Sequence, residues 1–316
     1  MKIYRSLDDL PSHTTPSVVT IGNFDGVHRG HRMVIDAVIA RARELNAQSI
    51  AITFDPHPIR ILRPDIDVRL ITPLPQKLEL LAATGLDATL VIPFTRDFSN
   101  LTAREFATQV LRDRLHTVEV HEGETFRFGH DAAEDVTGLA HLGADLGFTV
   151  RAYHPEDFRG SPVSSTRIRD LITAGDMPHA RALLGRPFAI RSTPASGRGY
   201  GTLYTVPTIN LAPYSDLLPA NGVYISTLRV GTRTFRAVTN AGNRPTFGAD
   251  SFAIESHLLD FEPLTLTEET PLELTFLNRL RGEIRFPSPA ALRAQIGLDI
   301  QKANRYFALS KLISHN

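Results

Sequence analysis

Apolar and polar residues alternate in blocks along the first half of the chain, and this pattern predicts strands and helices in turn. Short, nearly continuous apolar runs are typical of strands that are buried on both faces of a parallel sheet. They predict strands near 18–22, 50–54, 88–92, 117–121 and 148–153, and helical periodicity lies between them near 29–45, 75–84, 103–115 and 133–146. The alternation indicates a parallel sheet wrapped by helices.

The pattern changes near residue 185. Two more helical stretches, 165–174 and 177–184, lead to Gly185. Beyond them, segments rich in Thr, Val, Tyr and Ile predict strands near 187–193, 222–230, 233–241, 252–260 and 271–278, and then a helix from about 288 to 312. We therefore expect two domains, residues 1–185 and 186–316, of which the second is an antiparallel β-barrel with a terminal helix.

A glycine-rich turn with two histidines follows the first strand of the predicted sheet. It comprises Gly22, Asn23, Phe24, Asp25, Gly26, Val27, His28, Arg29, Gly30 and His31. The glycines let the backbone turn sharply and approach a ligand, while the following helix aims unpaired N–H groups into the same crevice. His28 and His31 face the same way on the first helical turn and suit a polyphosphate. A plain turn with surface histidines and a metal site would both share this spacing. The chain has no Cys, and no third ligand lies nearby in the sequence, so the residues do not favour a metal site.

A second candidate anion site begins at Ser164 and Ser165. With serine as the helix cap, Thr166 and Arg169 share one face of the first turn, so that hydroxyls, backbone donors and a guanidinium meet. An ordinary helix cap is the alternative interpretation. In the second half, a glycine-rich stretch with Gly197, Arg198 and Gly199 precedes Pro207, Thr208, Ile209 and Asn210, an order that fits a flap over nucleotide phosphates and a threonine facing Mg²⁺. An ordinary hairpin would also fit these residues.

Composition narrows the functional classes. The 316 residues include 34 basic and 34 acidic side chains, so no overall charge attracts nucleic acid. No segment has the roughly 18 uncharged apolar residues of a membrane span, and the first residues lack a signal-peptide core. We expect a cytoplasmic protein without nucleic-acid or membrane partners; the sequence gives no indication of its oligomeric state.

The motifs together resemble a known family. The stretch from Gly22 to His31 looks like the signature of nucleotidyltransferases related to the bacterial bifunctional riboflavin kinase/FAD synthetases, and Pro207 to Asn210 is similar to the riboflavin kinase motif. The resemblance covers nearly the whole chain. It implies an α/β nucleotidyltransferase-like Rossmann domain followed by an all-β riboflavin kinase barrel with a C-terminal helix. It also implies ATP-dependent phosphorylation of riboflavin to FMN and adenylylation of FMN to FAD, with Mg²⁺ in both reactions.

The resemblance assigns roles to individual residues. Those implied as catalytic are His28, His31 and Arg169 in adenylyl transfer and Glu255 as the base of the kinase. Implied nucleotide ligands are Gly22, Asn23, Phe24, Asp25, Gly26, Gly30, Ser164, Ser165, Thr166, Gly197, Arg198, Gly199 and Asn210, with Thr208 and Asn210 toward the metal. Implied flavin contacts are Phe54, Pro56, His57, Pro58, Thr125, Phe126, Phe128 and Arg244.

Three positions depart from the family pattern. Thr125 stands where many members have Asn, Thr205 where many have Gly, and Ile209 where Ala is usual. Two alternatives therefore stay open: an enzyme that retains only one of the two activities, and a flavin-binding regulator without turnover.

Overall fold

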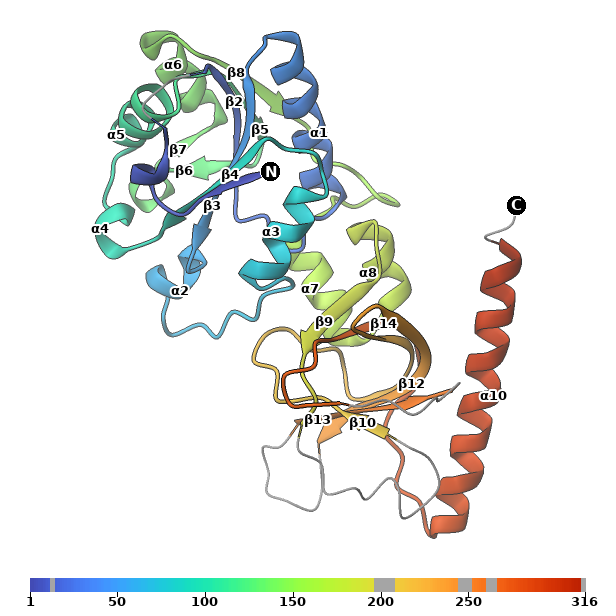
Figure 1. Ribbon diagram of the computed structural model, residues 1–316. Helices are drawn as coiled ribbons and strands as arrows, with labels where there is room; N and C mark the ends of the chain where they lie inside the picture. Colours follow the sequence, from blue (N-terminus) through green and yellow to red (C-terminus); the bar gives the residue numbers. More distant parts are fainter. Residues whose placement is uncertain (12–14, 196–207, 244–251, 260–265, 314–316) are drawn as a thin grey trace. The chain divides into compact units, whose positions relative to one another are not determined.

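The chain folds into two compact units, Met1–Ser165 and Thr166–Asn316 (Figure 1). The computed structural model describes residues 1–11, 15–195, 208–243, 252–259 and 266–313. Each unit has its own sheet and its own hydrophobic core.

The first unit is built on a six-stranded parallel sheet in the order β1-β4-β3-β2-β5-β8. The strands are β1 (Lys2–Tyr4), β2 (Ser17–Ile21), β3 (Gln48–Asp55), β4 (Ala88–Pro93), β5 (Thr117–Gly123) and β8 (Thr149–Tyr153). From β2 the chain proceeds to β3 and β4 on one side, and from β5 to β8 on the other. The strand order therefore reverses between β2 and β5, and open α/β sheets bind ligands at the carboxyl ends of such a strand pair.

Helices cover both faces of this sheet. They are α1 (Arg29–Glu44), α2 (Pro58–Leu62), α3 (Leu74–Ala82), α4 (Arg96–Ser99), α5 (Ala103–Phe106), a π-helix (Ala107–Arg114) and α6 (Val136–Leu146). Val18 of β2 packs in the core with α1, whereas Val19 packs in the opposite core with α5 and α6. Successive strand residues point to opposite faces, so a strand covered on both sides is apolar at every position. This confirms the expected parallel sheet wrapped by helices.

The second unit contains an antiparallel sheet in the order β10-β13-β12-β11-β14-β9. Its elements are α7 (Ser165–Ala174), α8 (Met177–Leu184), β9 (Phe188–Ser192), β10 (Thr208–Asn210), β11 (Gly222–Val230), β12 (Arg233–Asn243), β13 (Phe252–Leu258), β14 (Leu272–Arg281) and α10 (Pro289–Ile313). Just beyond β9 and β10, Ala195 N donates to Asn210 O at 2.8 Å and Ala212 N donates to Thr193 O at 2.8 Å. These bonds join the two edges of the sheet, as the predicted barrel requires.

The barrel separates an interior face from a face that α10 partly covers. Tyr224 and Phe276 make an edge-to-face contact with ring centroids 5.2 Å apart, and both are fully buried in the interior. On the other face, Val223 and Ile225 of β11 pack against Ala303 and Phe307 of α10. The long terminal helix is therefore anchored to the sheet, which agrees with the sequence expectation.

The predicted elements are confirmed within a few residues, and the structure adds several short elements, among them the helices α2 and α4. The sequence interpretation omitted the edge strands β1 and β10, each three residues long, and the small hairpin of β6 (Arg127–Phe128) and β7 (Glu134–Asp135). The expected helix 103–115 continues from α5 as a π-helix, in which Leu115 N donates to Val110 O at 3.1 Å. Strands this short carry too little periodicity to be recognised.

Helices α7 and α8 belong to the second compact unit rather than the first. Helix α8 packs against β9 and β14, and Arg279 of β14 donates to Ala174 O at 3.4 Å. The compact division thus falls earlier in the chain than the expected boundary after residue 185, which stays a prediction.

Candidate functional site

The glycine-rich turn leaves the carboxyl end of β2, beside the point where the strand order reverses. A Cβ on Gly22 would lie 3.2 Å from the Phe24 ring, which folds back over the turn, and Gly26 has a φ of +84°. The positive φ of Gly26 favours glycine there, and a side chain at position 22 would press on the Phe24 ring. The turn therefore lies at the carboxyl ends of β2 and β5, where open α/β sheets bind ligands.

The Asp25 carboxylate ties this turn to a distant segment. It accepts hydrogen bonds from Ile71 N at 3.1 Å and Thr72 N at 3.0 Å, and the Thr72 hydroxyl in turn accepts from Gly26 N at 2.9 Å. Asp25 is only 1% exposed. Its side chain thus holds the shape of the turn, a role that the sequence interpretation, which assigned Asp25 to the nucleotide, did not include.

The two histidines of the motif stack on each other. Their ring centroids are 3.6 Å apart with an interplanar angle of 17°, and Phe24 meets His31 edge-on at 5.2 Å. His28 is the N-cap of α1, and its Nδ1 accepts a hydrogen bond from His31 N at 3.3 Å. The imidazoles therefore lie together at the positive end of the α1 dipole, where anions are stabilised.

The Ser164–Ser165 segment also lies beside the turn. The Ser165 hydroxyl donates to the Asp25 carbonyl at 2.8 Å, and a Cβ on Gly30 would lie 3.8 Å from the Val163 carbonyl. The structure thus brings the start of this second motif to the first. Thr166 and Arg169 follow in the first turn of α7, in the second unit, and their place at the site stays a prediction.

The two segments expected to contact flavin are linked by a row of aromatic rings. Phe54 at the end of β3 lies 6.1 Å from Phe98, which lies 6.2 Å from Phe106, which lies 6.1 Å from Phe128. Phe126 stacks on Phe128 with ring centroids 5.4 Å apart.

The row packs against the core: Phe106 and Phe128 are buried, and Phe54, Phe98 and Phe126 are partly buried. The peptide bond before Pro56 is cis. His57 is the N-cap of α2, and Pro58 is the first residue of that helix. Thr125 is exposed. Contact of these residues with flavin stays a prediction.

Sequence reasoning missed two buried ionisable residues near this edge. Glu122, at the end of β5, accepts hydrogen bonds from Ile21 N and from the Thr20 hydroxyl at 3.4 Å, and burial raises its pKa well above 4.5. Lys77 of α3 is 2% exposed, and burial lowers its pKa although Asp25 and Asp55 oppose the shift. A single charged residue in a strand or in the first turn of a helix is usually exposed. The sequence therefore gave little indication that Glu122 and Lys77 are buried.

In the second unit, three of the predicted site residues share one face of the sheet. Asn210 of β10 pairs directly with Glu255 of β13, and Thr208 pairs with His257. Directly opposed residues of an antiparallel pair point the same way, and residues two apart share a face. Their neighbours Ile209, Ile254 and Ser256 are buried on the opposite face. Thr208, Asn210 and Glu255 therefore come together, whereas Gly197, Arg198, Gly199 and Arg244 lie outside the described residues.

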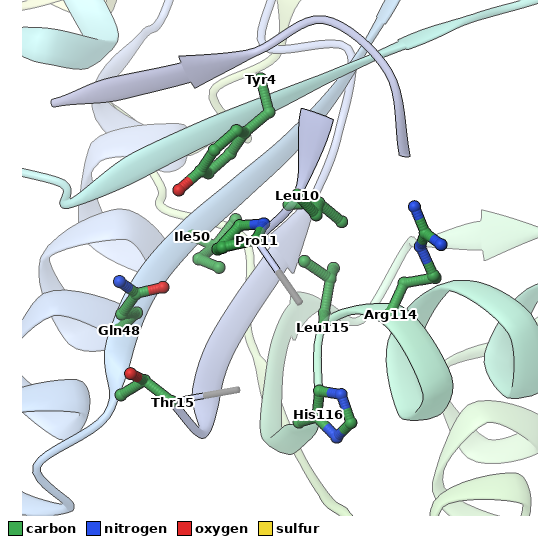
Figure 2. Close-up of a pocket in the computed structure, with 9 residues that line it drawn as sticks. All are labelled: Tyr4, Leu10, Pro11, Thr15, Gln48, Ile50, Arg114, Leu115 and His116. Carbon is green, nitrogen blue, oxygen red and sulfur yellow. The ribbon is translucent and has the colours of Figure 1, made fainter. Parts of the chain in front are cut away.

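The pocket in Figure 2 lies at the other edge of the first sheet. Among its lining residues are Gln48, which begins β3, and His116, which immediately precedes β5. Both mark the amino ends of parallel strands. This pocket is therefore separate from the glycine turn, which follows the carboxyl end of β2.

Comparisons with known proteins match both units. The family model described as FAD synthetase matches residues 10–167, and the one described as riboflavin kinase matches residues 184–307. A bifunctional riboflavin kinase/FMN adenylyltransferase of Pseudomonas fluorescens is 34% identical over 311 residues, covering 98% of this chain and 99% of its own. The protein of the same description from Escherichia coli strain K12 is 32% identical over 313 residues, with 98% and 99% covered.

A solved structure gives the same fold over nearly the full length. It is described as a macrolide-efflux protein from Streptococcus pneumoniae, and it matches with a TM-score of 0.86 and 25% identity, covering 96% of this chain and 98% of that one. None of the helices in the described residues has the length and apolar character that a membrane crossing requires.

Proposed function

The chain belongs to the family of bifunctional riboflavin kinase/FMN adenylyltransferases, and from this premise we propose how its own residues divide the two reactions. The enzyme phosphorylates riboflavin to FMN and adenylylates FMN to FAD, with ATP as co-substrate of both steps. The observation that carries the assignment of the first unit is the stacked His28 and His31 pair at the start of α1.

In the first unit, a phosphate oxygen of FMN attacks the α-phosphorus of ATP, the bond to the β-phosphate oxygen breaks, and pyrophosphate leaves. The FMN phosphate is already ionised at neutral pH, so the step needs alignment and charge stabilisation rather than a strong base. His28, His31 and the N–H groups at the start of α1 stabilise the charge that develops on the leaving pyrophosphate. Arg169, Ser164, Ser165 and Thr166 complete the phosphate site in this proposal.

In the second unit, Glu255 accepts the proton of the riboflavin 5′-hydroxyl as that oxygen attacks the γ-phosphorus of ATP and ADP leaves. A primary alcohol is a weak nucleophile and needs this base, whereas a phosphate does not. The shared face of Thr208, Asn210 and Glu255 supports the proposal.

Mg²⁺ fits the same face, because a hydroxyl and an amide carbonyl are the hard oxygen ligands that it prefers. We assign Thr208 and Asn210 to hold it. When bound, Mg²⁺ neutralises charge on the ATP phosphates. The proposed partners are riboflavin, FMN and ATP alone, without nucleic acid or membrane, and dependence on ATP supports a cytoplasmic location.

Two substitutions test the division between the units. With riboflavin, ATP and Mg²⁺, His28→Ala should accumulate FMN without FAD. Glu255→Ala should form no FMN from riboflavin, yet convert added FMN to FAD. Product analysis by chromatography measures both outcomes.

The matched controls are His141→Ala and Glu269→Ala, which replace exposed residues of the same types in the same two units. Both controls should make FMN and FAD at the rate of the unmodified enzyme. Loss of FMN formation in His28→Ala, or loss of FAD formation from added FMN in Glu255→Ala, would contradict the assignment.

A further inference from the structure

We propose that Glu122 is a positioning residue of the adenylyl-transfer site, whose side chain replaces a strand partner and sets the opening between β2 and β5. The inference rests on the proposed function of the first unit. It concerns a residue to which neither the motif nor the resemblance gave a role.

The hydrogen-bond ladder between β2 and β5 ends before the strands do. Their paired residues run from Ser17 with Thr117 to Val19 with Val120. On its other side, β5 stays paired with β8 up to Gly123 with Tyr153. Strand β5 thus continues for three residues after it has separated from β2, and the crevice at the reversal of strand order opens there.

Glu122 fills the place of the missing partner. The Ile21 N–H, which lies two residues beyond the last paired residue of β2, donates to the Glu122 carboxyl group instead of to a backbone carbonyl. Beyond Ile21, Gly22 N donates to Ile52 O of β3 at 2.9 Å, so β2 stays attached on that side while the turn begins. The Glu122 side chain therefore spans the gap at the root of the glycine turn, directly before the residues assigned to the phosphates.

This carboxyl group lies in apolar surroundings. It is 4% exposed, and burial raises its pKa well above 4.5, opposed only by the hydrogen bonds from Ile21 and Thr20. Strand alternation directs the charged Glu119 and the neighbouring His121 to the opposite face of β5. In the described part of the chain, no charged group contributes to this shift.

Burial favours the neutral form of this carboxyl group, and the neutral form suits this place. It accepts the Ile21 N–H without adding negative charge to a crevice that must receive the phosphates of both ATP and FMN. The ionised form would repel those phosphates in a site of low dielectric constant. We expect adenylyl transfer to fall by about tenfold as this carboxyl group ionises, because like charges repel.

Glu122→Gln and Glu122→Leu separate the two effects. Glutamine retains a carbonyl oxygen for Ile21 N–H and stays neutral at every pH, so this variant should keep adenylyl transfer and lack the loss that ionisation of Glu122 causes as the pH rises. Leucine fills a similar volume without an acceptor, so kcat/KM for adenylyl transfer should fall by about tenfold or more at all pH values, because a buried donor is left unsatisfied.

The assay is FAD formation from added FMN and ATP between about pH 6 and pH 10, with riboflavin phosphorylation by the same samples as the internal reference. Glu79→Gln, at an exposed position of α3, is the matched control and should keep the unmodified profile. The difference between the Glu122→Gln and unmodified profiles is informative even if Glu122→Leu does not fold.

A loss of adenylyl transfer with rising pH in Glu122→Gln equal to that of the unmodified enzyme would overturn the inference, as would full activity of a folded Glu122→Leu. Failure of the unmodified enzyme to make FAD from FMN would instead overturn the proposed function, so the two failures are distinguishable.

Discussion

Replacing Asp25 tests whether the glycine turn keeps its shape through its bonds to residues 71 and 72. The carboxylate accepts backbone N–H groups of Ile71 at 3.1 Å and Thr72 at 3.0 Å, and it is buried. A hydrogen bond to a charged group contributes about 1.5–3 kcal/mol, so Asp25→Ala should lower the unfolding free energy of the first unit by about 3–6 kcal/mol. Asp25→Asn retains one acceptor and should cost about half as much.

The loss in Asp25→Ala is a large part of a typical total stability of about 5–15 kcal/mol. The chain has no tryptophan, so far-ultraviolet circular dichroism in urea reports unfolding, and hydrogen exchange on peptides of each unit separates the two contributions. Adenylyl transfer should fall with the first unit while riboflavin phosphorylation remains.

The matched control for this series is Asp36→Ala, which removes an exposed ion pair with Arg32 on α1 and should cost less than about 1 kcal/mol. The reasoning is refuted if the free energy of unfolding of the first unit in Asp25→Ala lies within about 0.5 kcal/mol of its value in the unmodified protein.

Three further predictions concern the first unit. Gly129→Ala should destabilise it by about 1–3 kcal/mol, because Gly129 has a φ of +77° and a new Cβ would lie 2.8 Å from Ala103 N. Urea titrations measure this loss, and an unchanged midpoint would contradict the prediction. Burial raises the pKa of Glu119, but hydrogen bonds from Arg41 and two neighbouring side chains outweigh burial and hold the pKa below 4.5. The contribution of ionised Glu119 to the free energy of unfolding is therefore fully present above pH 4.5 and is lost as the pH falls further. In acid titrations, Glu119→Gln should lose stability less steeply than the unmodified protein. Burial lowers the pKa of Lys77 below 10.5, so the unfolded chain binds more protons between the two pKa values and the unfolding free energy should rise toward pH 10.5. Melting curves of Lys77→Met should lack this rise, and a rise equal to that of the unmodified protein would count against the assignment.

The strands and helices that form the two units follow from local patterns. The continuous apolar run at Val18 and Val19 predicts a strand covered on both faces, and the structure places these two side chains in opposite cores. The pairing of His28 with His31 is equally local, because residues three apart on a first helical turn are neighbours. Such features depend on residues only a few positions apart.

The short edge strands were less accessible to sequence analysis. Strand β10 has three residues, too few for an alternating pattern, and it is stabilised by pairing with β13 and by the bonds near Ala195. Helix α8 packs against β9 and β14, a contact between segments that local patterns do not reveal.

The sequence by itself determined the order of the elements, the two sheets, the glycine turn and the identity of the residues that could meet phosphate. Only the tertiary structure decided that Asp25 holds residues 71 and 72, that Glu122 replaces a strand partner of Ile21, and that Asn210 lies opposite Glu255. The physical reason is range: periodicity and capping act within one or two turns of the chain, whereas each of these contacts joins segments that meet only when the sheets assemble.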